Sequence, residues 1–275
     1  MHLNSITAAA AIGFLLGLAE ADDAERAERR IGYQEPSSAP LSARWARTGM
    51  SSSVLQWVLE EDDPELNARV WHHPSVDDAM RRAILRGMAH GPGRTGSIPL
   101  SPRLADVQEP PVPAGVAHLD PIGALRGVRS MGEGRAAASL VVGRAAWQDV
   151  VEADRQGPLP GYARWALSIR PDCPGTLRAQ FGSHPKFAHR LAQAGIAETP
   201  AEYALEWTPA AHVLEVLYLG RSLFPHRAAE AADALRPLVR EHLGDRPEAW
   251  AVLAQLIETY HGTAPELLAT ASAVA

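Results

Sequence analysis

The chain repeatedly places a short polar residue directly before a segment with helical periodicity, and this feature limits it to a fold of many short helices. Asp63–Pro64 and Thr208–Pro209 pair a capping side chain with proline. Four further segments carry an acid three residues after the cap: Ser75–Asp78, Thr199–Glu202, Asp245–Glu248 and Thr263–Glu266. The capping oxygen accepts from an N–H that has no partner within the helix, and proline is tolerated because its missing N–H needs none. Each segment therefore predicts a helix start.

These starts divide the C-terminal part of the chain into helices near 200–207, 209–224, 227–243, 246–261 and 264–274. Apolar residues recur there at helical spacing, as at Trp250, Leu253 and Ile257. Short links between such helices favour antiparallel neighbours. We predict an all-α protein of short antiparallel helix pairs, stacked as an irregular α-solenoid or helical bundle, with more than about 55% helix and less than about 5% strand.

One long segment interrupts this pattern. Residues 87–121 contain seven prolines and five glycines, with few large apolar residues. A loop of that length is uncommon inside a compact domain. We therefore predict an N-terminal helical region at 1–90, a Pro/Gly-rich loop or linker at 91–121, and a C-terminal helical-repeat region at 122–275.

The N-terminal residues Ile6 to Leu18 form an apolar run. A secretory signal needs a positively charged start, whereas His2 and the free amine are the only candidates here, and the run is too short to span a bilayer. We expect a buried helix capped by Asn4 or Ser5, with a signal-like segment as the alternative. The single Cys173 is consistent with a reducing compartment, so we expect a cytoplasmic protein without membrane association.

The stretch Glu60–Leu85 combines an acidic turn, a short helix containing Asn67–Trp71, a His73–Pro74 turn and a second short helix. This arrangement resembles the HEAT-like and leucine-rich-variant helical repeats, and residues 159–196 resemble them more loosely. The resemblance implies an α-solenoid-like stack with a binding surface, and it implies no particular chemistry because the family is functionally diverse.

Two charged stretches are candidate contact sites. The stretch between Asp78 and Asp106 contains no acidic residue. It contains five arginines, which could contact an anion or nucleic acid: Arg81, Arg82, Arg86, Arg94 and Arg103. The stretch lacks aromatic residues for base stacking, and a solvated helix face is the simpler interpretation. An acidic run could be a solvated turn or a docking patch for a basic partner: Glu60, Glu61, Asp62, Asp63 and Glu65.

The arginines on the second short helix have an expected direction. Val76, Met80 and Ile84 are spaced so that they share one helix face. We expect this face to be buried, and we expect Arg81 and Arg82 to point towards solvent.

The sequence motifs typical of nucleotide-binding and metal-binding sites are incomplete in this chain. Gly91–Ser97 has the glycine spacing of a P-loop but lacks its lysine. Glu258–His261 has the Glu-x-x-His spacing of a carboxylate-bridged metal site in one copy where two are needed, and His184 and His189 are poorly spaced for shared ligation. We therefore predict no catalytic, cofactor or metal residue and no cofactor, and the sequence favours a non-enzyme while leaving the question open.

Two functions remain. The first is a non-catalytic binding or scaffold protein that holds another protein on a helical-repeat surface. The alternative is a DNA-interacting HEAT-like protein, such as a base-excision glycosylase. Because nucleic-acid-binding faces are strongly basic, the net charge of −6 makes nucleic acid the less favoured partner.

Overall fold

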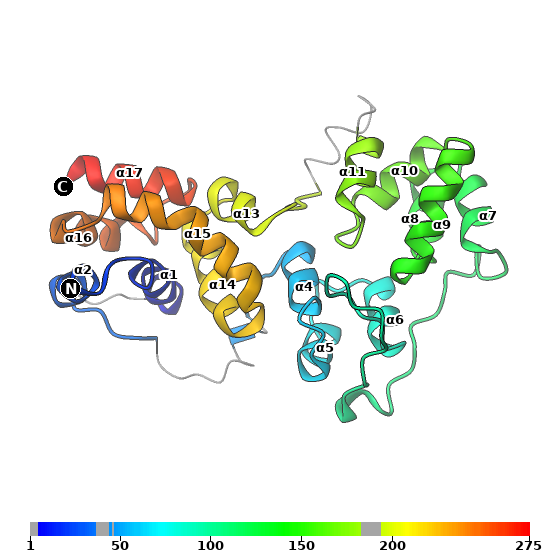
Figure 1. Cartoon of the computed structure of the whole chain (residues 1–275), viewed down its shortest axis with the longest axis horizontal. Helices are drawn as coiled ribbons and strands as arrows, with labels where there is room; N and C mark the ends of the chain where they lie inside the picture. Colours follow the sequence, from blue (N-terminus) through cyan, green and yellow to red (C-terminus); the bar gives the residue numbers. More distant parts are fainter. Residues whose placement is uncertain (1–4, 37–43, 46, 183–193) are drawn as a thin grey trace. The chain divides into compact units, whose positions relative to one another are not determined.

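The computed structural model of the chain describes residues 5–36, 44–45, 47–182 and 194–275. These described residues are 61% helical, and they form fifteen α-helices and no β-strand (Figure 1). The all-α prediction is therefore confirmed. The chain divides into two compact units, which are described separately: unit 1 combines Met1–Thr48 with Ala197–Ala275, and unit 2 is Gly49–Ile196.

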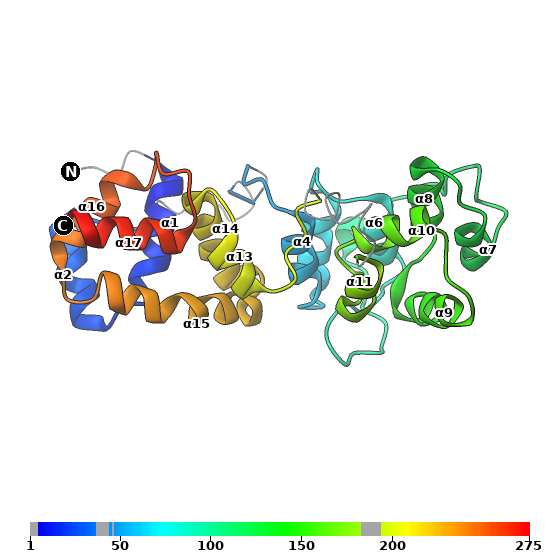
Figure 2. The same ribbon diagram turned by 90° about the horizontal axis from the view of Figure 1, so that it is seen from above.

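Unit 1 brings the two ends of the chain together. Its helices are α1 (Ile6–Leu16), α2 (Ala21–Ile31), α13 (Pro200–Glu206), α14 (Ala210–Leu223), α15 (Pro225–His242), α16 (Pro247–Leu256) and α17 (Ala264–Val274). In both views α1 lies beside α14 and α2 beside α16 (Figures 1 and 2).

Helix α1 is the buried helix predicted from its apolar run. Nine of its eleven residues are buried, and Ser5 caps it by accepting from the Ala8 N–H. Gly13 lets the side chains of Tyr33 and Tyr218 pack directly on the helix backbone, because a Cβ there would lie 2.2 Å from the Tyr33 hydroxyl and 3.1 Å from the Tyr218 ring. The helix is thus surrounded by side chains from elsewhere in unit 1.

The predicted caps of unit 1 form in part. Thr263 and Glu266 make a complete capping box at α17, and Thr199 accepts from the Glu202 N–H at α13. The box predicted at Asp245–Glu248 does not form, because α16 begins after Arg246 without a side-chain cap. Glu248 instead accepts from Arg30 of α2 at 3.1 and 2.8 Å.

Unit 2 consists of shorter helices: α4 (Ser52–Leu59), α5 (Pro64–Trp71), α6 (Asp78–Leu85), α7 (Pro121–Arg126), α8 (Met131–Ala138), α9 (Gly143–Gln156), α10 (Gly161–Ser168) and α11 (Gly175–Gly182). Helix α5 packs against both α4 and α6, and helix α10 packs against both α8 and α11. A core of large apolar side chains joins α7 to α11, including Leu125, Val141, Trp147, Val150, Trp165 and Phe181. Cys173, the single cysteine of the chain, is buried in the turn between α10 and α11.

Residues 86–120 are irregular as expected, with the short 3₁₀ helix η1 (Pro102–Leu104) as their one helical element. The segment predicted as a loop or linker, 91–121, lies inside unit 2, and the units divide after Thr48 and before Ala197. The physical reason is burial: Ile98, Ser101 and Leu104 are inside the unit and hold the segment to it. Proline and glycine content shows that a segment is irregular, and tertiary contacts decide whether it is a linker.

Candidate functional site

The two charged stretches singled out in the sequence contact each other. Asp62 adopts a left-handed backbone (φ 53°), and its buried carboxylate accepts from the N–H groups of His90 (2.8 Å) and Gly91 (3.1 Å). Arg94 lies 3.6 Å from the same carboxylate. The acidic turn therefore fixes the start of the Pro/Gly-rich segment.

A second contact repeats this arrangement farther along the segment. Glu65 accepts from the Ser101 hydroxyl at 2.7 Å and pairs with Arg103 at 3.3 Å. Asp63 caps α5 by accepting from the Glu65 and Leu66 N–H groups. Glu60 and Glu61 are half-buried. Three members of the proposed docking patch, Asp62, Asp63 and Glu65, thus hold parts of unit 2 together.

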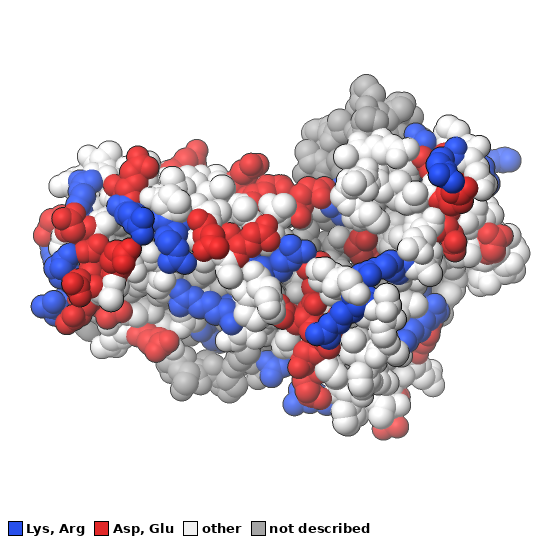
Figure 3. Space-filling view, in the orientation of Figure 1, with Lys and Arg blue, Asp and Glu red and all other residues white. Residues whose placement is uncertain are grey.

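The remaining arginines of the basic stretch also bond within the chain. Arg86 pairs with Glu109, and this hydrogen bond raises the pKa of Arg86 and lowers that of Glu109. Arg81 pairs with Asp78 at 3.3 Å and donates to the carbonyls of Trp71 and His73. On the face shown in Figure 3, positive and negative side chains likewise lie beside one another.

Arg82 does not point to solvent as expected. It is 1% exposed, and it donates to the carbonyls of Ser139 (2.6 Å), Pro111 (3.4 Å) and Pro110 (3.5 Å). Burial lowers its pKa. The expected burial of Val76, Met80 and Ile84 is confirmed, so α6 is buried on two sides because the chain beyond η1 returns over it.

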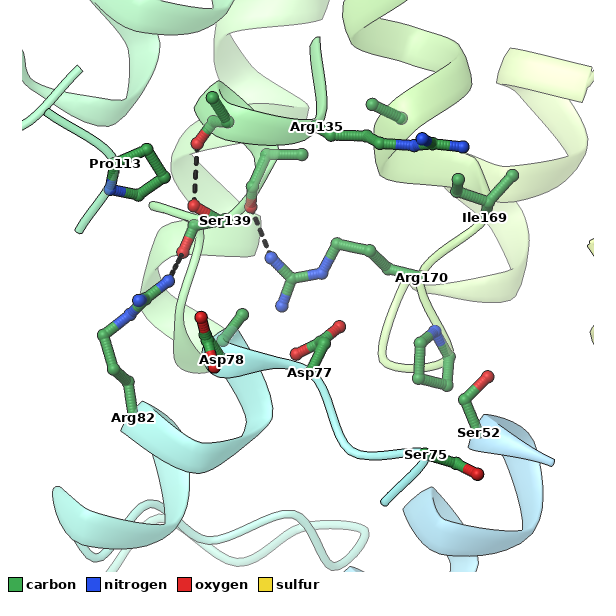
Figure 4. Close-up of a pocket in the computed structure, with 15 residues that line it drawn as sticks. Ser52, Ser75, Asp77, Asp78, Arg82, Pro113, Arg135, Ser139, Ile169 and Arg170 are labelled. Atoms are coloured by element: carbon green, nitrogen blue, oxygen red, sulfur yellow. Dashed lines mark hydrogen bonds between the residues drawn. The ribbon is translucent and has the colours of Figure 1, made fainter. Parts of the chain in front are cut away.

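A cavity of about 530 Å³ lies next to Arg82, within unit 2. It is lined from α4, α6, α8 and α10 and from the segments that join them (Figure 4). Its polar and charged lining residues are Ser52, Ser75, Asp77, Asp78, Arg82, Arg135, Ser139 and Arg170. The remainder of the lining is alanine, proline and Ile169, whose short or compact side chains leave the space open.

Two buried arginines define one wall of this pocket. Arg82 donates to the Ser139 carbonyl, and Arg170, which is 7% exposed, donates to the Ala138 carbonyl (Figure 4). Ala138 is the last residue of α8 and Ser139 is its C-cap, so neither carbonyl has a partner inside the helix and both lie at the negative end of its dipole. The two guanidinium groups therefore cap the C-terminus of α8 and fix the wall.

Arg170 also binds Asp172. Its Nε and Nη2 donate to the two carboxylate oxygens at 2.9 and 2.7 Å, and the Trp147 indole N–H donates to the same carboxylate at 3.0 Å. Burial disfavours both charges, but the pairing outweighs it, so that the pKa of Asp172 is lowered and that of Arg170 is raised. Arg170 is thus neutralised behind the pocket wall.

His90 lies beside this pair. Its Nδ1 is 3.4 Å from the Gln56 amide nitrogen, whereas its Nε2 and the Gln56 Oε1 are buried without a hydrogen bond in the described part of the chain. Burial lowers the pKa of His90, and the nearby carboxylates of Asp172 and Asp62 oppose this shift. The net result is a pKa of His90 below its ordinary value.

Asp77 and Arg135 complete the charged lining. Asp77, rather than the predicted Ser75, caps α6 by accepting from the Met80 N–H at 2.8 Å. Arg135 on α8 lies over the Trp165 ring, 5.1 Å from its centroid, and pairs with no carboxylate in the described residues. Gly134 allows this close packing of α8 on α10, because a Cβ there would lie 2.6 Å from the Tyr162 carbonyl.

Sequence reasoning named Arg82 as a candidate contact and Asp78 as part of a helix start, and it missed the other charged residues in and around this pocket. Asp77, Arg135, Arg170 and Asp172 have no local motif, because elements separated by up to about a hundred residues bring them together. Within the described ranges no group of three or more His, Cys, Asp or Glu side chains could hold a metal ion. His184 and His189 lie outside those ranges.

Among the described helices, none has the length and apolar character needed to cross a membrane. Comparison of the chain with protein-family models, with curated proteins and with solved structures found no match.

Proposed function

We propose that the chain is a non-catalytic binding protein that holds another protein, and that the pocket of unit 2 receives a segment of this partner. The observation that carries the proposal is the pocket itself. Its volume of about 530 Å³ lies in the range of ligand-binding sites, and its lining combines apolar surface with a few placed polar groups.

The rigidity of the pocket supports the same proposal. The α8 wall is fixed by Arg82 and Arg170, and the α6 side by the Asp77 cap. A preformed wall reduces the ordering cost that a partner segment must overcome on binding. The resemblance of residues 60–85 to helical repeats agrees with this role, and the repeat organisation remains a proposal.

DNA binding has less support. Each of the five arginines in the basic stretch contacts an acid or carbonyl of the chain, as Arg86 does with Glu109 and Arg82 with Ser139. Counterion release by these residues would require breaking those contacts first. A cytoplasmic location is also a proposal, supported by the single cysteine.

A photo-crosslinking residue placed at Ala136, in the pocket, tests the proposed function. The control carries the same residue at the exposed Val151 on α9. We expect one discrete crosslinked protein from position 136, absent from position 151, and lost when Ala166→Phe fills the pocket in the same chain. Equal crosslinking at both positions, or a product that survives the filled pocket, would overturn the proposal.

A further inference from the structure

The charges that line the pocket do not cancel locally. Arg170 is paired with Asp172, and Asp78 is paired with Arg81 at 3.3 Å. Asp77, Arg82 and Arg135 remain, which leaves one positive charge in excess. Asp77 is further committed to the N-terminus of α6, where the helix dipole favours its negative charge.

Arg82 and Arg135 differ in what they can offer a ligand. Arg82 is buried and already bonded to carbonyls, so it contributes mainly its charge. Arg135 is exposed, and within the described chain its guanidinium has a ring contact and no hydrogen-bond acceptor. Its planar fork of N–H donors is therefore open to a ligand, and the Trp165 ring supports one of its faces.

The surfaces near Arg135 are apolar. Ile169, three alanines near it in the lining of the pocket and two prolines supply apolar surface: Ala136, Ala138, Ala166, Pro113 and Pro171. Figure 4 draws Arg135 and Ile169 in the upper part of the view, and Ser52 and Ser75 at the lower right. An occupant that fills this space therefore needs an apolar body as well as a negative group.

We propose that the pocket recognises a carboxylate carried on an apolar body, and that Arg135 binds this carboxylate through two parallel N–H···O bonds. This proposal rests on the proposed binding function and names the ligand chemistry. A single excess positive charge matches the single charge of a carboxylate, and the planar guanidinium matches its two oxygens. The carboxylate can belong to a protein partner, as a chain terminus or acidic side chain, or to a free organic acid.

The probes are dansyl-leucine and its carboxamide, which share the same body, while the amide lacks the negative charge and one of the two acceptor oxygens. Fluorescence anisotropy with the full chain should show binding of the acid about tenfold tighter than the amide, a difference of about 1.4 kcal/mol. Arg135→Gln should abolish this preference, and Arg135→Lys should restore part of it. The control, Arg155→Gln, changes an exposed arginine of the same unit and should leave the preference intact. Equal affinity of the wild type for acid and amide, or a preference that survives Arg135→Gln, would overturn the proposal.

A second pair of probes separates the two sources of carboxylate. Dye-labelled tetrapeptides ending in leucine are compared with a free and with an amidated C-terminus. Preference for the free peptide supports the carboxylate and the protein partner together. Preference confined to dansyl-leucine supports the carboxylate and contradicts the protein partner. Crosslinking at position 136 without any acid preference supports the partner and overturns the carboxylate.

Discussion

Arg82 on α6 donates to the carbonyl of Ser139 at 2.6 Å, a contact across 57 residues of sequence that joins α6 to the C-terminus of α8. Arg170 donates to the preceding carbonyl, of Ala138, which also accepts from the Val141 N–H at 3.1 Å. Two buried cations therefore lie at the C-terminus of α8. The candidate pocket depends on this arrangement, since its wall is the capped end of α8.

Replacing Arg82 with Ala should destabilise the protein by about 2–4 kcal/mol, because charge-assisted hydrogen bonds are lost and buried carbonyls are left without a donor. Denaturant melts of the full chain measure the change. Arg155→Ala is the matched control on an exposed position and should stay within about 0.5 kcal/mol. A small effect of Arg82→Ala, equal to that of the control, would contradict the role assigned to its contacts.

The Asp62 carboxylate should protect the segment that follows α6 from proteolysis. Asp62→Ala removes the acceptor of the His90 and Gly91 N–H groups and the partner of Arg94. Trypsin cuts after arginine, and we expect cleavage near Arg94 or Arg103 first in the wild type and several-fold faster at Arg94 in the variant. Mass spectrometry of early fragments locates the cuts. Glu61→Ala is the comparison in the same turn, and an equal acceleration there would argue against a specific Asp62 clamp.

His90 should make stability fall with acidification. Its folded pKa is lowered by burial, so the unfolded chain takes up a proton first as the pH drops below the ordinary imidazole value of about 6.5. The unfolded state then binds more protons, and stability falls by up to about 1.4 kcal/mol per pH unit until the folded pKa is reached. Asp172, whose folded pKa is also lowered, adds a loss in the same direction at lower pH.

Urea melts between pH 7.5 and 5.5 test this dependence. The variant His90→Gln should flatten the profile in that range, whereas His118→Gln, at an exposed position, should leave it unchanged. A His90→Gln profile that is parallel to the wild type would assign the pH dependence to other groups.

Removing the predicted capping side chain should change stability differently at the two similar cap sequences of unit 1, Thr263–Glu266 and Asp245–Glu248. Thr263→Ala should cost about 1 kcal/mol, because Thr263 accepts from the Glu266 N–H and completes a capping box. Asp245→Ala should change stability by less than about 0.5 kcal/mol, since α16 begins after Arg246 without a side-chain cap. Thermal melts of the two variants compare the sites, and equal losses would contradict the difference.

The sequence by itself determined the all-α class and several helix starts. Asp63, Thr199 and Thr263 cap their helices as predicted, because a cap is a hydrogen bond to an N–H two or three residues away. The buried faces of α1 and α6 follow equally from the local spacing of apolar residues.

Tertiary structure alone decided which charges far apart in the sequence are partners. Asp62 and Arg94, or Arg30 and Glu248, belong to different parts of the sequence, and no local rule pairs them. The sequence predicted an exposed Arg82 because the apolar periodicity of α6 indicates only one buried face. The chain at Pro110 and Pro111 covers a second face of α6 and supplies carbonyls that accept from Arg82. The pocket could not be predicted from the sequence for the same reason. Its lining residues become neighbours only when α6, α8 and α10 pack, because burial and long-range hydrogen bonds are properties of the folded chain.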